Sequence, residues 1–270
     1  MVVQHNLSAM NTNRQMGVVT SALQKSTEKL SSGYKINRAG DDAAGLSISE
    51  KMRSQIRGLN KASDNAQDGI SLIQVAEGAL NETHSILQRM NELATQAAND
   101  TNTSVDRQSI KDEIEQLNEE LDRISTTTQF NKQDLLTGGF SGKLQVGALE
   151  RQTMDVKISL AVSAKGLNVS AVEVSTNAKA GAAMQSIQDA IESVSKQRSK
   201  LGAIQNRLEH TINNLDTNAE NTQAAESRIR DTDMADEMVQ YSKNNILSQA
   251  GQSMLAQANQ QTQGVLSLLG

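Results

Sequence analysis

The sequence contains no proline, cysteine or tryptophan, and only two tyrosines and two phenylalanines among 270 residues. Without proline, nothing in the chain forces a helix to stop. Aromatic side chains normally supply much of the bulk of a globular core, so a thick core is not expected. Ala, Ile, Leu and Met at helical spacing favour slender helical bundles instead. The lack of cysteine leaves the redox compartment open.

Strong charge and long apolar runs are lacking too. The formal charge is −5, with lysine and arginine scattered along the chain, so neither nucleic acid nor an anionic membrane is expected as a partner. No apolar run approaches the 18 or so residues that span a bilayer, and the start shows no basic segment followed by an apolar one. We therefore expect no membrane insertion and no Sec signal.

Uncharged polar residues are abundant instead. Gln, Asn, Ser and Thr occupy many of the positions outside the apolar stripes. Polar surfaces without charge pack against one another without burying unpaired ions. This composition suits a protein that packs against copies of itself.

Two long apolar series at every seventh position dominate the chain. One runs through Leu46 to Ala98 and the other through residues 187–215, and a shorter seam predicts a helix over 104–128. Each seam predicts a helix whose stripe another helix must cover. We expect an antiparallel three-helix rod. Its predicted core residues are Met52, Leu59, Ile73, Leu80, Leu87, Ile114, Leu117, Leu121, Val194, Leu201, Leu208 and Leu215. Asp41 or Asp42 is expected to cap the first helix, and Asp100 or Ser104 the second.

Between the seams the apolar period changes from helical to two. Apolar residues alternate with mostly polar ones from Met154 to Val162, which predicts a β-strand. Candidate neighbours for a small hairpin sheet are Leu144 and Val146 before it, and Val169, Val172 and Val174 after it. We expect this β-rich insert to be the only non-helical region.

The terminal segments carry apolar stripes too weak to stand alone in water. Residues 1–36 have a sparse stripe that ends at a predicted hinge around Gly33 and Gly40, and the last forty residues are similar. An antiparallel rod brings both segments to one end, where they can pair with each other or with neighbouring molecules. We expect residues 1 to about 40 and 232–270 to be flexible in a free monomer and to fold on assembly.

No catalytic, cofactor or metal site is predicted. His5, His84 and His210 are far apart, and there is no HExxH helix. The stretch GGFSGKL has the wrong spacing for a phosphate loop. Asp231, with the acidic residues after it, is a candidate cation ligand, but helix capping is the favoured interpretation.

Longer stretches of the sequence resemble bacterial flagellin. LSSGYKINRAGDDAAGLSISEKMRSQIRGLNKASDNAQDGISLIQVAEGALNE is similar to its N-terminal half, and LGAIQNRLEHTINNL, AAESRIRDTDMADEMV and ANQQTQGVLSLLG to its C-terminal half. The likeness covers nearly the whole chain apart from roughly 138–180. It implies a secreted, extracellular subunit of the bacterial flagellar filament that forms a helical homopolymer.

The resemblance also implies a domain organisation. Residues 1–40 and 231–270 would be the helices of the inner filament core, 41–137 and 181–230 the rod, and 138–180 the β-rich insert. Export would use the flagellar type III apparatus, with export chaperone, junction and cap proteins as partners. The implied filament-core assembly residues are Leu7, Met10, Leu23, Leu30, Met238, Leu255, Val265, Leu266 and Leu269.

A last implication of the resemblance concerns immunity. Arg89 and Leu93, with Glu113 on the next predicted helix, match the flagellin surface bound by the flagellin-sensing Toll-like receptor of animals. Three alternatives to a filament subunit make different demands on the sequence. A hook–filament junction protein shares the terminal helices, a generic coiled-coil adaptor would lack the hinge and the insert, and an insert with metallopeptidase activity would need histidine, which this one lacks.

Overall fold

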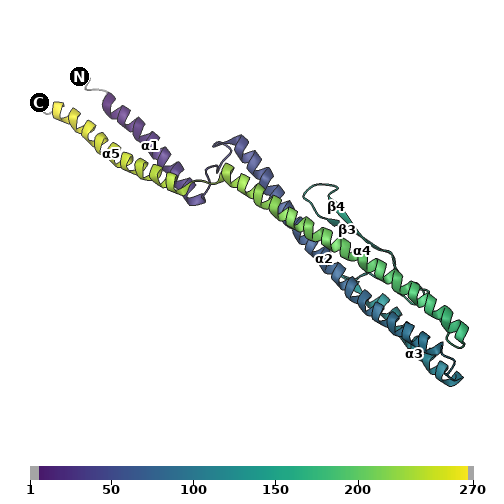
Figure 1. Ribbon diagram of the computed structural model, residues 1–270. Coiled ribbons are helices and arrows are strands. Elements are labelled where there is room, and N and C mark those ends of the chain that lie inside the picture. The colour runs from purple at the N-terminus through teal and green to yellow at the C-terminus, as the bar shows by residue number, and fades with distance from the viewer. Residues whose placement is uncertain (1–5, 267–270) are drawn as a thin grey trace. The chain divides into compact units, whose positions relative to one another are not determined.

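The computed structural model describes residues 6–266, and within this range the chain forms five helices and four short strands (Figure 1). The helices are α1 (Leu7–Ser32), α2 (Ala43–Ala97), α3 (Ser104–Thr127), α4 (Asn177–Arg230) and α5 (Met234–Leu266). The strands are β1 (Gln129–Phe130), β2 (Gln133–Asp134), β3 (Phe140–Gln145) and β4 (Thr153–Ile158). The predicted mainly helical fold with a small β-hairpin is confirmed.

The chain divides into two compact units. Unit 1 consists of Met1–Ser54 with Asn221–Gly270, and unit 2 of Gln55–Glu220. Unit 1 therefore holds α1, α5, the start of α2 and the end of α4. Unit 2 holds α3, the strands and most of the two long helices.

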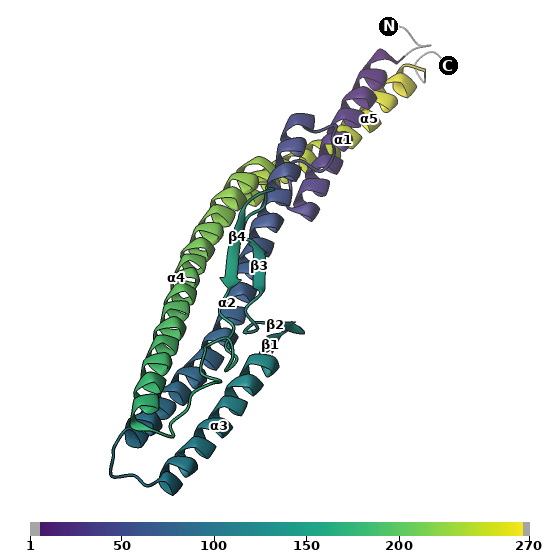
Figure 2. The same cartoon turned by 90° about the vertical axis from the view of Figure 1, so that its right-hand side faces the viewer.

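In unit 2, α2 and α4 lie side by side and run antiparallel (Figures 1 and 2). The hydroxyl of Ser63 donates to the carboxylate of Asp216 at 3.0 Å. At the other end of α2, the side-chain amide of Asn177 donates to the carbonyl of Ala98. Residues later in α2 therefore contact residues earlier in α4, which shows that the two helices are antiparallel. This arrangement lets the two heptad seams face each other.

Helix α3 folds back along the last turns of α2. Arg89 of α2 pairs with Glu113 of α3, with 2.9 Å between Nη2 and Oε1. Nearer the turn, the Nε–H of Arg107 donates to the carbonyl of Ala97 at 3.1 Å. That bond satisfies one of the carbonyls left open where α2 ends.

The start of α3 corrects one expectation. Neither Asp100 nor Ser104 is the cap. Thr103 accepts from the backbone of Asp106, whose carboxylate in turn accepts from the Thr103 amide at 2.9 Å. This capping box lowers the pKa of Asp106, chiefly through the Thr103 hydroxyl. At α2 the cap is Asp42, which accepts from a backbone amide in the first turn at 2.9 Å.

Strands β3 and β4 form the predicted hairpin. They pair antiparallel from Phe140 opposite Ile158 to Gln145 opposite Thr153. Alternate residues of β4 are buried: Met154, Val156 and Ile158. The hairpin therefore presents one apolar face to the bundle, as an alternating pattern predicts.

The strand is shorter than its pattern suggested. β4 ends at Ile158, before Val162, and Val169 and Val174 lie in irregular segments instead of strands. All three of these valines are fully buried. Alternation of apolar and polar residues indicates which side chains are buried. Here an irregular, turn-rich segment buries those side chains without the hydrogen bonds of a β-sheet. For example, the amide of Val169 donates to the carbonyl of Ala164 at 2.9 Å.

Two glycines of α2 let the hairpin approach closely. A Cβ on Gly58 would lie 2.9 Å from the Cβ of Ala148, and one on Gly69 would overlap the side chain of Leu144. Between them, Asn65 donates to a carbonyl of β3 at 3.1 Å. A side chain at Gly58 would push the segment at Ala148 away from the helix, whereas one at Gly69 would require the Leu144 side chain to move.

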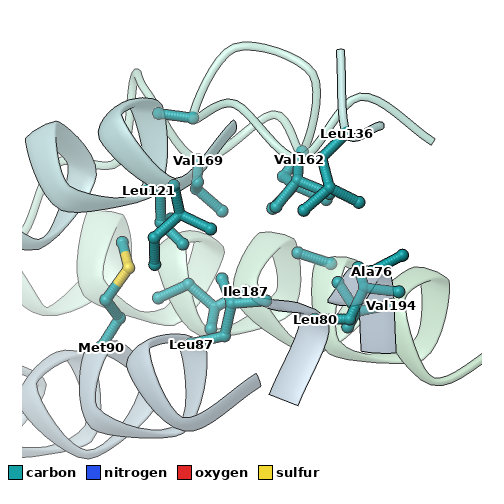
Figure 3. Packing of buried hydrophobic residues seen from close by; sticks show 14 of the residues in the cluster. Ala76, Leu80, Leu87, Met90, Leu121, Leu136, Val162, Val169, Ile187 and Val194 are labelled. Carbon is teal, nitrogen blue, oxygen red and sulfur yellow. The ribbon is translucent and has the colours of Figure 1, made fainter. Parts of the chain in front are cut away.

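The core of unit 2 draws on all three helices and the insert. Figure 3 shows Leu80 and Leu87 of α2, Leu121 of α3, Val162 of the insert and Ile187 of α4 converging. Among the predicted core residues, those that are at most 7% exposed are Leu59, Ile73, Leu80, Leu87, Ile114, Leu121, Val194, Leu201, Leu208 and Leu215. Leu117 and Met52 are half-buried.

Candidate assembly surface

Helices α1 and α5 of unit 1 form an antiparallel pair (Figures 1 and 2). The side-chain amide of Asn6 donates to the carbonyl of Ala258 at 2.9 Å. At the opposite end of the pair, Lys29 lies 3.3 Å from a carboxylate oxygen of Glu237. α1 ends at Gly33, whose φ of 75° is the left-handed conformation that glycine adopts most readily.

The contact side of α5 is mostly small and polar. Its residues recur every three or four positions, as one face of a helix must. Up to residue 261, those that are partly or fully buried are Glu237, Tyr241, Asn244, Asn245, Ser248, Gly251, Leu255 and Ala258. Only two of them, Tyr241 and Leu255, carry a large apolar or aromatic side chain, so the larger apolar side chains within the pair come mostly from α1, at Met16, Val19, Leu23 and Leu30.

Other large apolar residues of the pair face solvent. Val239 and Ile246 are 66% and 67% exposed and lie seven positions apart, on one side of α5. Leu7 of α1 is 69% exposed. We call the whole set the outward face. Its members are Leu7, Met10, Val18, Met234, Met238, Val239, Ile246, Leu247 and Met254. A face of this kind is typical of a surface that binds another molecule.

The residues predicted for filament assembly fall into three groups. Leu7, Met10 and Met238 belong to the outward face. Leu23, Leu30 and Leu255 are half-buried within the pair. Val265 and Leu266 lie in α5 but outside the side chains that the structure describes, and Leu269 lies outside the described residues.

A polar cluster in unit 1 holds the segment after α1. The Tyr34 ring lies near two guanidinium groups, 5.6 Å from Arg53 and 4.8 Å from Arg230. Beside them Glu226 is 8% exposed, accepts from the hydroxyl of Ser49 at 2.9 Å and lies 3.6 Å from Arg53. The pairing offsets the cost of burying that carboxylate. It also ties the start of α2 to the end of α4.

The three residues matched to the receptor-binding surface lie close together in unit 2 but differ in exposure. Arg89 is half-exposed and sits between Glu113 at 2.9 Å and Glu92 at 3.2 Å. Hydrogen bonds to Glu113 and then Glu92 raise the pKa of Arg89, which keeps it charged. Leu93 is only 2% exposed. Its side chain belongs to the helical core and is not available to a partner in this conformation.

The acidic residues at the start of α5 act as a helix cap. The carboxylate of Asp233 accepts from the amides of Ala235 at 2.9 Å and Asp236 at 3.3 Å. Among the described residues, no three His, Cys, Asp or Glu side chains are grouped as metal ligands. In the same part of the chain, no helix combines the length and apolarity needed to cross a membrane.

Comparison with known proteins agrees with this geometry. The family profile of the bacterial flagellin N-terminal helical region matches residues 3–141, and that of the C-terminal helical region matches 184–269. The chain is 56% identical over 271 residues to a flagellin of Halalkalibacterium halodurans and 51% identical over 304 residues to a flagellin of Bacillus subtilis. Each alignment covers both proteins in full.

Solved structures give a similar result. The crystal structure of Bacillus cereus flagellin matches with 33% identity and a TM-score of 0.51, covering 60% of this chain and 94% of that one. A proposed flagellar hook-associated protein of Vibrio parahaemolyticus is 15% identical and has a TM-score of 0.62. The match covers 71% of this chain and all of that one. At this identity the likeness shows the fold alone. The chain belongs to the bacterial flagellin family, whose members are structural subunits of the flagellar filament and not enzymes.

Proposed function

We propose that this chain polymerises with copies of itself into a flagellar filament, and that the outward face of α1 and α5 is the main contact between subunits. The observation that carries the proposal is the arrangement of the pair. The side of α5 that packs on α1 is mostly small and polar, while large apolar residues such as Val239 and Ile246 face solvent. Burying that apolar surface between subunits would drive association.

In this proposal residues 1–40 and 231–270 form the inner core of the filament, with the rod segments 41–137 and 181–230 and the insert 138–180 outside it. The filament is extracellular, and export uses the flagellar type III apparatus with chaperone, junction and cap proteins. Membership of the flagellin family supports this assignment.

The terminal helices are proposed to become fully ordered only on assembly. An isolated helix pair that leaves many of its large apolar side chains exposed has less apolar burial to offset its conformational entropy. Neighbouring subunits would supply the missing apolar contacts. In limited proteolysis of the monomer we expect cleavage within 1–40 and 232–270 before any cleavage in unit 2. Equal resistance of the termini would contradict this.

The experiment for the proposed function is polymerisation of the purified chain, followed by sedimentation and negative-stain microscopy after a polymerising salt is added. We expect filaments from the full-length protein and none from a variant lacking residues 232–270. Persistent monomer from the full-length protein, even with filament seeds, would contradict the proposal. It would favour the alternative, a hook–filament junction protein, which the fold likeness to a hook-associated protein keeps open.

We further propose that the chain is a ligand of the flagellin-sensing Toll-like receptor of animals. The support lies in Arg89 and Glu113, which form an exposed, charge-paired patch on neighbouring helices. Because Leu93 is buried, its part would be to hold the helix that presents Arg89. The proposed contact therefore rests on the two charged side chains.

Replacing Arg89 with alanine is expected to weaken receptor binding roughly tenfold or more, because arginines that become buried when two proteins bind are frequent hot spots. The measurement is the dissociation constant for the receptor ectodomain. Arg123→Ala is the matched control, since Arg123 is also exposed and pairs with a glutamate, Glu120, within α3. Unchanged affinity of Arg89→Ala would remove the proposed site. The Leu93→Ala variant is unsuitable, because it would leave a cavity in the core.

A further inference from the structure

The methionines of this chain are distributed unequally between the two units. In unit 2, Met90 is fully buried and Met154 is 8% exposed. In the α1 and α5 pair, four methionines are at least 48% exposed, and all four belong to the outward face. They are Met10, Met234, Met238 and Met254.

Each of these methionines has an apolar neighbour on the same side of its helix. Met10 lies three residues after Leu7, and Met238 lies four residues after Met234, so the members of each pair are adjacent on the helix surface. Met254 lies seven residues after Leu247, two turns further along the same side. A change of polarity at one sulfur therefore alters an apolar patch and not an isolated side chain.

Exposed thioethers react with peroxides. The sulfur attacks one peroxide oxygen, the O–O bond breaks, and the products from hydrogen peroxide are a methionine sulfoxide and water. The sulfur is oxidised by two electrons and the peroxide is reduced by two. The sulfoxide is polar and accepts hydrogen bonds, so burying it in an apolar contact without a donor is unfavourable.

We propose that Met10, Met234, Met238 and Met254 form a peroxide-sensitive modification site that controls polymerisation. Oxidation of the monomer at these positions blocks entry into a filament. Methionine sulfoxide reductases restore it with electrons from a dithiol, which becomes a disulfide while the sulfoxide oxygen leaves as water. The inference rests on the proposed function, because it assumes that the outward face is buried between subunits. Within a filament the same burial protects the thioethers.

The experiment treats the full-length monomer with dilute hydrogen peroxide, maps the oxidised residues by peptide mass spectrometry, and measures the critical concentration for seeded polymerisation. We expect sulfoxide at the four positions before Met90 or Met154 is oxidised. The critical concentration should rise roughly tenfold or more, because each sulfoxide places a polar group in the contact. Methionine sulfoxide reductases of both stereospecificities should restore the original value. Preformed filaments should be oxidised at these positions more slowly than the monomer.

The control is a variant with Met10→Leu, Met234→Leu, Met238→Leu and Met254→Leu. Leucine is apolar and of similar volume but has no sulfur to oxidise. The critical concentration of this variant, measured before and after the same peroxide treatment, should therefore not change. The Met184→Leu variant, changed at a half-buried methionine of unit 2, should be inhibited like the unmodified chain.

The outcomes separate the two proposals. If the untreated chain stays monomeric, the proposed function fails and the inference fails with it. If the untreated chain polymerises and the protein oxidised at all four positions polymerises equally well, only the inference is overturned. Inhibition of the four-leucine variant by peroxide would also overturn it, because another residue would then be responsible.

Discussion

Replacing Val239 and Ile246 with aspartate is expected to leave the subunit folded and monomeric but unable to polymerise. Both side chains are about two-thirds exposed in the monomer, so the carboxylates would remain hydrated there at little cost. In a filament, two unpaired charges would be buried in an apolar contact, at a cost of several kcal/mol per ion. About 3 kcal/mol already corresponds to a critical concentration about a hundredfold higher. Sedimentation across a range of protein concentrations measures the change.

Val105→Asp is the matched control for this variant. Val105 is 73% exposed and lies in the first turn of α3, outside the terminal helix pair. An aspartate there faces solvent and is favourable near a helix N-terminus. We expect a critical concentration close to that of the unmodified chain. If the double aspartate variant polymerised as readily as this control, the outward face would not be the subunit contact.

The second large effect concerns the stability of unit 2. Leu80 of α2 and Leu201 of α4 are both fully buried in its core. Changing either to alanine should lower the free energy of unfolding by about 2–5 kcal/mol, through lost burial and the cavity that remains. Urea unfolding followed by circular dichroism measures this change.

A small-effect control lies in the same unit. Val105→Ala removes exposed atoms and should change the stability by about 0.5 kcal/mol or less. If the two leucine variants were no less stable than Val105→Ala, the heptad seams would not form the core. Because unit 2 does not contain the outward face, the leucine variants should still polymerise wherever they remain folded.

The three helices of unit 2 were predictable from sequence because their apolar residues repeat at one spacing over many turns. Leu59 through Ala94 on α2 are all buried on that seam. The apolar series of α4 is interrupted by the polar residue Thr222. Beyond it, in unit 1, the contact between α4 and α2 is the polar pair of Glu226 and Ser49. Nothing in the spacing indicates that those two side chains meet, since they are 177 positions apart.

The insert and the caps were less predictable. Alternation identified β4 but not its end, because Val162 and Val169 are buried in irregular segments, which a period of two does not distinguish from a strand. Several residues before α3 are able to cap a helix. The deciding signal was a pair, Thr103 with Asp106 three positions later, which is the spacing of a capping box.

The candidate assembly surface was only partly predictable. Weak apolar stripes indicated that α1 and α5 need partners, but they did not show which side of each helix faces the other. Val239 and Ile246 are not among the residues predicted for assembly, although both are exposed, and Leu255, which is among them, lies within the pair. The available signal was the small and polar series around Ser248 and Gly251, because close helix packing selects such residues.

A helical reconstruction by electron cryomicroscopy of filaments assembled from the purified chain tests the central claim most directly. We predict that Leu7, Val239 and Ile246, each more than 60% exposed in the monomer, become buried against neighbouring subunits at the centre of the filament. If these side chains remained exposed, with subunits touching only through unit 2, the proposed assembly surface would be contradicted.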